Sequence, residues 1–600
     1  MISSPVTEHG VSLMMVEGGL TAIAVATAFC WPRIGSAFFS TIENLFGSLA
    51  RKQGLAVLTV GITAILLRLA ILPLVPVPHA FVPDDFSFLL AADTFASGHL
   101  TNPTPVMWTH FESIHITMKP TYMSMYFPAN GLALAAGKVL FGHPWFGLLC
   151  MMGLMCAGIC WMLQAWLPPT WALLGGLIAV LRLGLFSYWI NTYSGGGSIA
   201  AFGGALVLGS LPRLKRTPRL RYGLLLAVGV ILLAITRPYE GILLCIPVAI
   251  VLSRWVLVSG ERLKLNVLVR SVAIPLVLIT AAGAWMGYYN YRAFGSPLTP
   301  PYKVDRATYA MAPYYAWQSP RPEPIYRHKV MRDFYYNNEL TAFKEIHNPS
   351  GFLRVTFFKC VRGIFFFSGL ALLPSLIMLP RLLTDRRIRF LLLTVLVLMV
   401  GMVIQIFLIP HYLAPFTAVF YTIGLQATRH LRVWRPGSQA VGVGLVRLMV
   451  TVCVVLGVVR LCTAPIHLRI PEWPASSWTG SWYGPLNFGV ERAQIENELE
   501  RSPGKQLAIV RYSSNHNPLD EWVYNSADIN NSKVIWAREM GATDNLELIR
   551  YYGDRTVWLV QPDLQPAGIS LYPMSETKMT PPSISSTSIP RHQSKTRQRG

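Results

Sequence analysis

The sequence carries little charge. Only 13% of its 600 residues are Asp, Glu, Lys or Arg, whereas an average soluble domain carries roughly 25%. Hydrophobic residues make up 52% of the chain, and the mean hydropathy is +0.42. This scarcity of charge excludes a soluble globular enzyme, a disordered protein and a collagen-like chain. It predicts a polytopic membrane protein with polar segments outside the membrane.

Acidic residues are scarcer than basic ones, 29 against 51, which gives a net charge of +22. The excess is concentrated in short loops between apolar runs, which contain Arg213, Lys215, Arg216, Arg219 and Arg221; Arg381, Arg386, Arg387 and Arg389; and Arg429, Arg432 and Arg435. Short basic loops beside membrane spans mark the cytoplasmic side. No polar segment interleaves basic residues with aromatics, so we expect no nucleic-acid partner.

Cysteine is also scarce, and no cysteine lies in a long polar loop. All eight fall within or at the ends of apolar runs, so the sequence predicts neither a disulfide framework nor a Cys-x-x-Cys site. A Gly-rich phosphate loop and an internal repeat are missing as well. A nucleotide site and a repeat fold therefore have no support.

Apolar runs that meet or approach the length of a membrane span dominate what is present. They lie near 12–31, 54–77, 145–166, 171–190, 196–211, 222–236, 241–258, 271–289, 361–380, 390–409, 411–428 and 441–462. With the basic loops in the cytoplasm, alternation places 78–144, 290–360 and everything after 462 outside. The first run contains Glu17 and lacks the features of a signal peptide, so residues 1–53 are expected to form an N-terminal segment with an extra span.

The composition changes after residue 462. Residues 463–504 are expected to be a linker, 505–575 a small extracytoplasmic α/β domain and 576–600 a disordered tail. Within the domain the pattern predicts strands at 506–512, 532–537 and 555–560 and helices at 519–529 and 545–552. Strands that alternate with helices predict a small parallel sheet.

An acidic pair, Asp84-Asp85, directly follows the second apolar run. Two adjacent carboxylates are costly to desolvate, and burial would raise the pKa of at least one of them. A carboxylate at this place can accept the proton of an attacking hydroxyl. The alternative is that Asp84 only caps the helix that begins at Phe86, which spacing alone favours.

The segments around this pair resemble a known family. Residues 86–98 read FSFLLAADTFASG, residues 119–142 read KPTYMSMYFPANGLALAAGKVLFG, and residues 411–416 read HYLAPF. Together with the topology they resemble the GT-C superfamily of membrane glycosyltransferases, including its protein O-mannosyltransferase-like and aminoarabinose-transferase-like branches. Two positions depart from the family pattern: Thr121 replaces a proline, and His411 replaces an arginine. The resemblance covers roughly the first 430 residues.

The resemblance implies a fold and a reaction. The fold is an all-α polytopic bundle of about 12 transmembrane helices, here residues 54–462, with outward loops 78–144 and 290–360. The reaction moves a sugar from a polyprenyl-phosphate donor in the bilayer to a hydroxyl of a protein, lipid or glycan acceptor. Asp84 would be the catalytic base and Asp85 its catalytic partner. The enzyme would lie in the inner (plasma) membrane with its site facing the cell envelope.

Several cationic and aromatic residues are candidates for binding the donor phosphate or sugar: Lys119, Arg182, Arg237, His411, Arg306 and Tyr302. Each has a competing interpretation. Arg237 also fits a local ion pair with Glu240, Arg182 also fits snorkelling to the interface, and a tyrosine in the second outward loop also fits an interfacial aromatic belt.

The metal requirement and the function class each leave an alternative open. The spacing His110-x-Glu112-x-x-His115 is not a zinc motif, so we expect no obligatory metal, although a divalent ion at Asp84 or Asp85 stays open. A transporter or flippase of a lipid-linked saccharide is the main alternative to an enzyme, and an inactive scaffold is another. The two halves of the chain show no similarity to each other, and the polar residues gather at one surface, which favours an enzyme.

Overall fold

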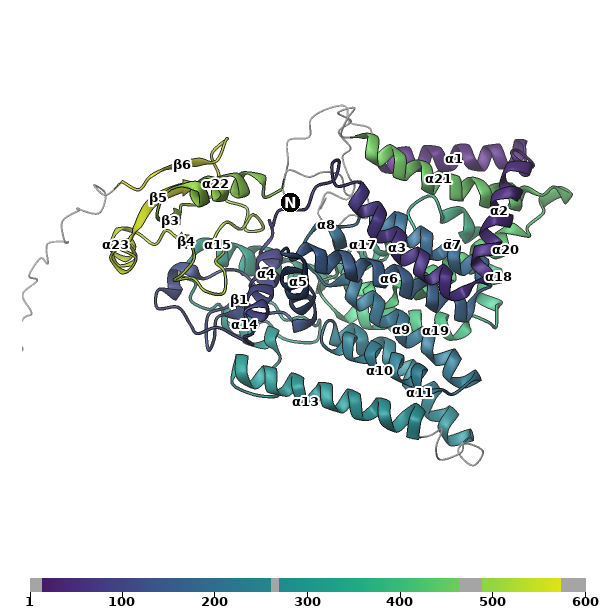
Figure 1. Ribbon diagram of the computed structural model, residues 1–600, viewed down its shortest axis with the longest axis horizontal. Helices are drawn as coiled ribbons and strands as arrows, with labels where there is room; N and C mark the ends of the chain where they lie inside the picture. Colours follow the sequence, from purple (N-terminus) through teal and green to yellow (C-terminus); the bar gives the residue numbers. More distant parts are fainter. Residues whose placement is uncertain (1–12, 260–268, 464–487, 574–600) are drawn as a thin grey trace, which may run out of the picture.

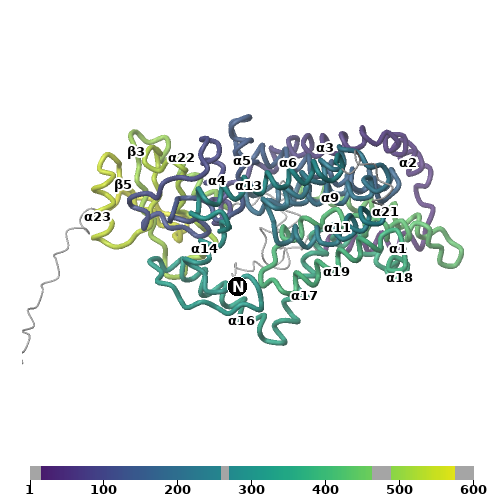
Figure 2. Tube along the Cα trace, turned by 90° about the horizontal axis from the view of Figure 1, so that it is seen from below, coloured from purple at the N-terminus to yellow at the C-terminus, as the bar shows by residue number. Residues whose placement is uncertain are grey.

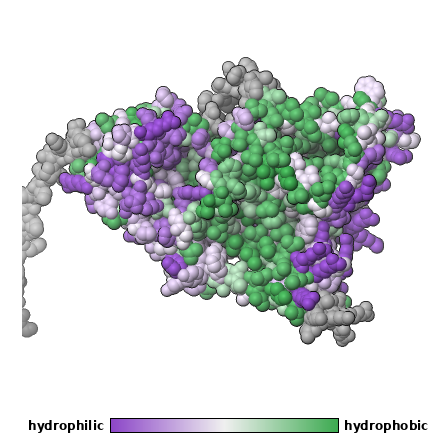
Figure 3. Space-filling model, viewed as in Figure 1, coloured by the Kyte–Doolittle hydropathy of each residue, from purple (hydrophilic) through white to green (hydrophobic). Residues whose placement is uncertain are grey.

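The computed structural model describes residues 13–259, 269–463 and 488–573. A bundle of helices forms one part of the molecule, and a small α/β domain with the polar loops forms the other (Figure 1). The surface has a broad apolar band between two polar ends (Figure 3). Such a band is what a bilayer requires of a multi-pass protein.

Six helical stretches are long and apolar enough to cross a membrane by themselves. They are formed by α3 (Gln53–Ala70), α6 (Trp145–Trp166), α9 (Gly197–Arg216), α11 (Pro238–Ser259), η3 with α13 (Val269–Ala273 and Ile274–Phe294) and α21 (Val441–Thr463). A seventh span results if η5 and α18 (Leu373–Met378 and Leu379–Thr384) are joined with α19 (Arg389–Ile404) across a 108° bend. The expected number of about 12 spans is therefore not reached among the described residues.

The expected spans fall short because their helices are interrupted. Three apolar stretches have only 10–17 residues each: Met15–Cys30 within α1 (Leu13–Cys30), α7 with η2 (Pro169–Ala179 and Val180–Gly184), and α10 (Leu220–Ala234). The expected span at 361–380 is broken because α17 (Pro349–Phe367) ends just before Gly369, whose φ is 61°. The span expected at 411–428 begins as a 3-10 helix, η6 (Pro410–Phe416), and α20 (Thr417–Arg432) ends in a basic turn.

The N-terminal helix α1 packs along α21 at the side of the bundle (Figure 1). Its Glu17 lies 3.3 Å from Arg182 Nη1, and both side chains are almost completely buried. Arg182 also donates to the carbonyl of Phe365 at 2.9 Å, and the Glu17 carboxylate accepts the amide of Ala371 at 3.1 Å. A buried charge needs a partner, which explains why an acidic residue is tolerated in α1. The expected donor contact of Arg182 is replaced by this ion pair.

The C-terminal domain contains a four-stranded sheet of order β4-β3-β5-β6. Strands β3 (Lys505–Val510), β4 (Val534–Arg538) and β5 (Arg555–Gln561) are parallel, as the sequence predicts, and β6 (Gly568–Leu571) adds an antiparallel edge. Helix α23 (Ala542–Tyr551) also matches its prediction. Two expectations were wrong: residues 519–529 are not helical, and α22 (Val490–Arg501) occupies part of the expected linker. The expected tail lies outside the described residues.

Residues 519–529 are irregular and dock onto the first outward loop. The amide of Glu521 donates to the carbonyl of Phe81 at 3.2 Å, and the Tyr122 hydroxyl donates to the carbonyl of Asn525 at 2.7 Å. A common apolar core joins the two parts, and it includes Leu90, Phe111, Ile116, Met118 and Tyr122 from the loop and Leu507, Ile509 and Ile535 from the sheet. The domain is therefore docked against the loop that carries the acidic pair.

The second outward segment completes this polar end. It contains α14 (Pro301–Tyr309), α15 (Lys329–Arg332), the π-helix η4 (Asp333–Glu339) and α16 (Leu340–Ile346). Both views place α14 beside the first loop and the α/β domain (Figures 1 and 2). Two outward segments and the C-terminal domain thus surround the start of α4 (Pro83–Ala96).

Candidate active site

The acidic pair lies in the first turn of α4. Pro83 occupies the first helical position, where its missing N–H costs nothing. Val82 is the N-cap, so the alternative in which Asp84 caps the helix is wrong. Carboxylates in a first helical turn are stabilised by the positive end of the helix dipole. Asp84 therefore stands at the helix start without capping it, whereas Asp85 accepts a backbone amide there.

Asp85 is buried and fixes the backbone around it. Its Oδ1 accepts the amide of Tyr193 at 2.9 Å, and its Oδ2 accepts the amide of Phe81 at 3.2 Å. Burial, with the neighbouring Asp84 carboxylate, raises the pKa of Asp85 to about 7. Asp85 joins the start of α4 to the turn after α8 (Tyr188–Asn191), which is a positioning role.

Asp84 points to two partners from the first outward loop. His115 Nδ1 lies 2.8 Å from Asp84 Oδ1, and the Tyr126 hydroxyl donates to the same oxygen. Burial raises the pKa of Asp84, but the charge and hydrogen bond of His115 outweigh it, so the pKa ends below its ordinary value. Burial likewise opposes the His115 charge, yet Asp84 raises the pKa of His115 above its ordinary value. Each partner therefore favours the charged form of the other.

His115 is held from several sides. Its backbone adopts φ 65°, an uncommon conformation outside glycine, and its carbonyl accepts the Ser87 hydroxyl at 2.6 Å. Its ring packs edge-on against Phe334 of η4, with 5.1 Å between ring centroids. The carboxylates of Asp305 and Glu339 also act to raise its pKa. His115 therefore connects both outward segments to Asp84.

Arg237 is a second cation, after His115, whose charge acts on Asp84. Its guanidinium donates to the carbonyl of Gly195 at 3.1 Å and lies 4.5 Å from the centroid of the Tyr412 ring. Its positive charge contributes to the lowered pKa of Asp84. No ion pair within 4.0 Å joins it to Glu240 in the described ranges, and Glu240 instead accepts Gln405 at 3.4 Å. The local ion-pair interpretation of Arg237 is therefore wrong.

His411 lies on the same side of the site as Arg237. Its Nδ1 is 2.7 Å from the Tyr188 hydroxyl, and its backbone amide donates to that oxygen at 2.9 Å. A Cβ at Gly195, whose φ is 89°, would come within 2.6 Å of the ring. The glycine turn therefore permits the close approach of His411.

The remaining predicted binding residues are divided. The Tyr302 ring packs between the rings of Phe127 and Tyr314, with centroid distances of 5.9 and 5.6 Å, and Phe127 directly follows Tyr126 in the chain. Lys119 is exposed and lies 4.3 Å from the Trp108 ring, where it makes no contact with the acidic pair within the described chain. Its expected donor contact is therefore not supported.

Arg306 is committed to a carboxylate. Its Nη1 lies 2.6 and 2.8 Å from the two oxygens of Glu339, and its guanidinium stacks on Tyr314 at 4.5 Å. Glu339 raises the pKa of Arg306, although burial opposes its charge. This salt bridge neutralises the guanidinium, so Arg306 shapes the second outward segment instead of offering a free positive charge.

Sequence reasoning missed two cations on α17. Lys359 is buried and donates to the carbonyls of Met402, at 3.2 Å, and Gln405, while Arg362 donates to that of Leu408 at 3.3 Å. Both thus bind the segment that leads into η6. The expected span began at 361, which assigned Lys359 to a loop and Arg362 to an apolar run. Their i, i+3 spacing on one helix face was the available signal.

The residues at the acidic pair do not fit a divalent cation. Both oxygens of Asp85 accept backbone amides, and Oδ1 of Asp84 is taken by His115 and Tyr126. No group of three His, Cys, Asp or Glu side chains within 13–259, 269–463 and 488–573 is arranged to hold a metal ion.

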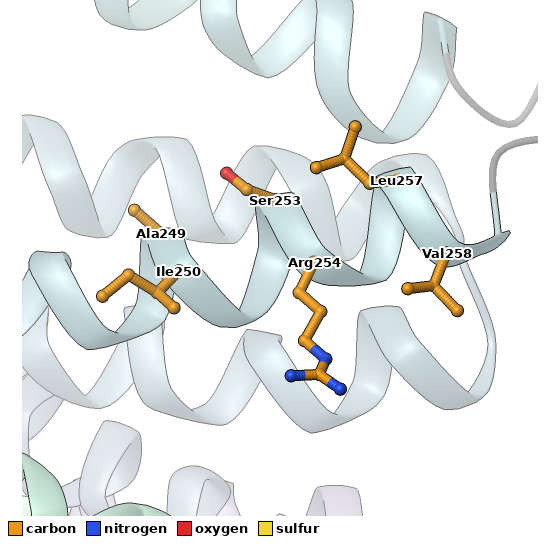
Figure 4. Close-up of a pocket in the computed structure, with 6 residues that line it drawn as sticks. All are labelled: Ala249, Ile250, Ser253, Arg254, Leu257 and Val258. Atoms are coloured by element: carbon orange, nitrogen blue, oxygen red, sulfur yellow. The ribbon is translucent and has the colours of Figure 1, made fainter.

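One hollow lies away from this site. It encloses about 600 Å³ beside the C-terminal half of α11. The residues that line it are Ala249, Ile250, Ser253, Arg254, Leu257 and Val258 (Figure 4). Its lining comes from one helix, whereas Arg237 precedes the other end of α11. The hollow is therefore a feature of the helix surface and contributes nothing to the acidic pair.

Comparison with known proteins gives remote structural likenesses. No family model and no curated protein sequence matches the chain. The chain is similar to the solved structure of ArnT (aminoarabinose transferase) from Cupriavidus metallidurans in the apo state, with 11% identity, 83% of this chain and 92% of that chain covered, and a TM-score of 0.47. At this level, likeness establishes neither a shared fold nor a shared activity.

Two structures of the Archaeoglobus fulgidus oligosaccharyltransferase are similar at the same identity of 11%. The complex with Zn and sulfate covers 84% of this chain and 67% of that chain, with a TM-score of 0.44. The complex with an inhibitory peptide and a dolichol-phosphate covers 84% and 69%, with a TM-score of 0.40. The proposed function rests instead on the geometry around Asp84.

Proposed function

We propose that the protein is an integral membrane glycosyltransferase that moves a sugar from a polyprenyl-phosphate donor to an acceptor hydroxyl outside the membrane. The observation that carries the proposal is the ionised Asp84. This carboxylate stands in the first turn of α4, is 19% exposed, and is paired with His115 beside the cationic Arg237. A partly accessible anion next to a cation, above an apolar bundle, suits a lipid that carries a phosphosugar.

Asp84 acts as the base in this proposal. The acceptor oxygen attacks the anomeric carbon and forms the new C–O bond while the bond from that carbon to the phosphate oxygen breaks. Asp84 takes the hydroxyl proton, and polyprenyl phosphate leaves with the bonding electron pair. Its lowered pKa keeps the carboxylate ionised and able to accept a proton at neutral pH.

The leaving phosphate needs cations and hydrogen-bond donors in a place with little water. Arg237 supplies a cation, because its guanidinium lies over the Tyr412 ring and its charge acts on Asp84. Lys359 and Arg362 hold the segment that leads to His411, so they keep the same region positively charged. Asp85 and Tyr188 position these elements.

The orientation follows from the charge pattern. The basic loops at 213–221, 381–389 and 429–435 belong in the cytoplasm by the positive-inside rule. Alternation then places Asp84, both outward segments and the α/β domain outside the inner (plasma) membrane. The lipid bilayer supplies the donor, and the cell envelope supplies the acceptor.

The test compares Asp84→Asn with Asp93→Asn in the purified full-length protein. Asp93 is on the same helix but pairs with Lys138 at 2.7 Å, so it is a matched control. Release of polyprenyl phosphate is measured from a panel of short-chain polyprenyl-phosphate sugars, with an envelope extract as acceptor. Loss of a general base lowers the rate by about 10²–10⁴-fold, whereas Asp93→Asn should stay close to wild type.

Two outcomes contradict the proposal. Equal turnover in Asp84→Asn removes the base assignment. Donor movement across a liposome bilayer, with no polyprenyl phosphate released by any variant, assigns the protein to the transporter or flippase class instead. Mass spectrometry of envelope glycans and lipids after deletion of the protein then identifies the sugar and its acceptor.

A further inference from the structure

A second, polar cavity lies between the α/β domain and the second outward segment. It encloses about 210 Å³. The sheet contributes Ser513 and Ser514 after β3 and Arg538 and Glu539 at the end of β4, and the outward segment contributes Lys329 and Asp333. None of these residues contacts the acidic pair in the described parts of the chain, so the cavity is a site of its own.

The position of this cavity is that of a ligand site. In open parallel sheets, ligands bind outside the carboxyl ends of the strands, near the point where the strand order reverses. The order β4-β3-β5 places the reversal between β3 and β5, and the cavity opens next to it at the same edge of the sheet, at the carboxyl ends of β3 and β4. Its volume is below the roughly 300–1,000 Å³ of pockets for drug-sized ligands, so it fits a single sugar unit.

The accessible charge in the cavity is positive. The side chains of Lys329 and Arg327 are 61% and 43% exposed, whereas those of Asp333 and Glu539 are 17% and 22% exposed. All four groups already have an ion-pair partner, Lys329 with Asp333, Arg327 with Glu112 and Glu539 with Arg511, but the two cations are the more exposed members. A ligand that enters the cavity therefore meets donors and cations before it meets carboxylates.

Arg538 provides an independent indication of a ligand. Its side chain is 2% exposed, and its Nη2 donates to Glu521 at 2.7 Å. Its Nη1 is buried and has no hydrogen-bond partner among the described residues. Such an atom is costly to leave unpaired, and Arg538 lines the cavity.

We propose that this cavity binds an acidic saccharide unit of the acceptor, with a carboxylate or phosphate group facing Lys329, Arg327 and Arg538. Serine hydroxyls and the paired carboxylates can meet the sugar hydroxyls, and the Tyr512 ring at the same wall offers an apolar face. The proposal rests on the proposed function, because it specifies the acceptor of the same enzyme.

One short segment joins the cavity to the catalytic pair. The π-helix η4 begins at Asp333, which lines the cavity, and its next residue, Phe334, packs on the ring of His115. Its last residue, Glu339, helps to raise the pKa of His115. Irregular π-helical turns of this kind often occur at functional sites. A saccharide in the cavity thus contacts the segment that supports the base.

Binding is measured by calorimetry on the full-length protein in detergent, without donor, with trigalacturonate as the acidic probe and maltotriose as the neutral one. Lys329→Glu reverses a cavity charge, and Ser514→Trp fills the cavity from an exposed position. Lys344→Glu is the matched control, an exposed lysine of α16 outside the cavity. We expect trigalacturonate to bind, and each cavity variant to weaken it at least tenfold while Lys344→Glu does not.

Other results overturn the inference. Equal binding of the two probes refutes acidic selectivity, absence of trigalacturonate binding refutes the site, and equal loss in Lys344→Glu shows a non-specific charge effect. Binding that persists in both cavity variants places the saccharide elsewhere. Because no donor is present and Asp84→Asn keeps the cavity intact, these outcomes are independent of whether sugar transfer itself is confirmed.

Discussion

Replacing His115 with asparagine removes the positive charge that lies 2.8 Å from the Asp84 carboxylate. At this separation Coulomb's law with an effective dielectric constant of about 20 gives roughly 6 kcal/mol, an upper bound because both groups retain some contact with water. Opposite charges within this range lower a carboxyl pKa by about 1–3 units in practice. Without His115, burial dominates and raises the pKa of Asp84.

The consequence appears on the acid side of the pH–rate profile. The base works only when Asp84 is deprotonated, so activity is lost as the pH falls through its pKa. Because that pKa is lower than usual in the native protein, wild type should keep its activity to lower pH than a free carboxyl allows. In His115→Asn the acid limb of kcat/KM should move upward by about 1–3 pH units.

The assay is release of polyprenyl phosphate at saturating acceptor, from pH 4 to 9, with His99→Asn as the matched control, since His99 is an exposed histidine of the same loop. A second measurement is thermal unfolding in detergent. The raised pKa of His115 means that the pair stabilises the fold below the ordinary histidine pKa and that this contribution is lost as the pH rises through the folded value. An active His115→Asn protein with an unmoved acid limb would refute the reasoning.

The other predictions concern two further charges. Arg237→Ala should raise KM for the donor at least tenfold and leave insertion unchanged, because its guanidinium donates to a backbone carbonyl and lies over the Tyr412 ring without a salt bridge among the described residues; a protein that fails to insert would indicate a structural role. Glu17→Gln should destabilise the fold by about 3–5 kcal/mol, since it leaves Arg182 buried without its counter-charge. In thermal unfolding the double variant Glu17→Gln/Arg182→Gln should recover most of that loss, and equal damage in the double variant would contradict the pairing.

Some of the site could be read from local sequence. Asp84 and Asp85 follow an apolar run and a proline, and this places them at a helix start whatever the rest of the chain does. The alternation of buried strands and helices after residue 504 likewise predicts a parallel sheet, because strand periodicity and the turn residues between strands are local properties. The prediction failed at 519–529, where an apolar stretch packs against the first outward loop instead of forming a helix.

The number of spans shows where local reasoning stops. An apolar run indicates that its residues are removed from water, but it does not indicate whether a single helix continues through the whole run. Gly369 and Pro415 interrupt two of the expected spans, and their effect depends on the backbone that surrounds them. The same limit applies to Arg182: its sequence context predicts a contact with a donor phosphate, whereas the tertiary structure pairs it with Glu17 of α1.

The sequence by itself determined that the chain is a multi-pass membrane protein and that two carboxylates follow an apolar run at a helix start, because hydropathy and helix starts depend on neighbouring residues. The partners of those carboxylates were decided only by the tertiary structure. His115 contacts Asp84 from the same loop, the charge of Arg237 acts on it from the turn before α11, and the C-terminal sheet packs on that loop from more than 400 positions away. Desolvation and pairing act between atoms that packing brings together, and packing is a property of the whole chain.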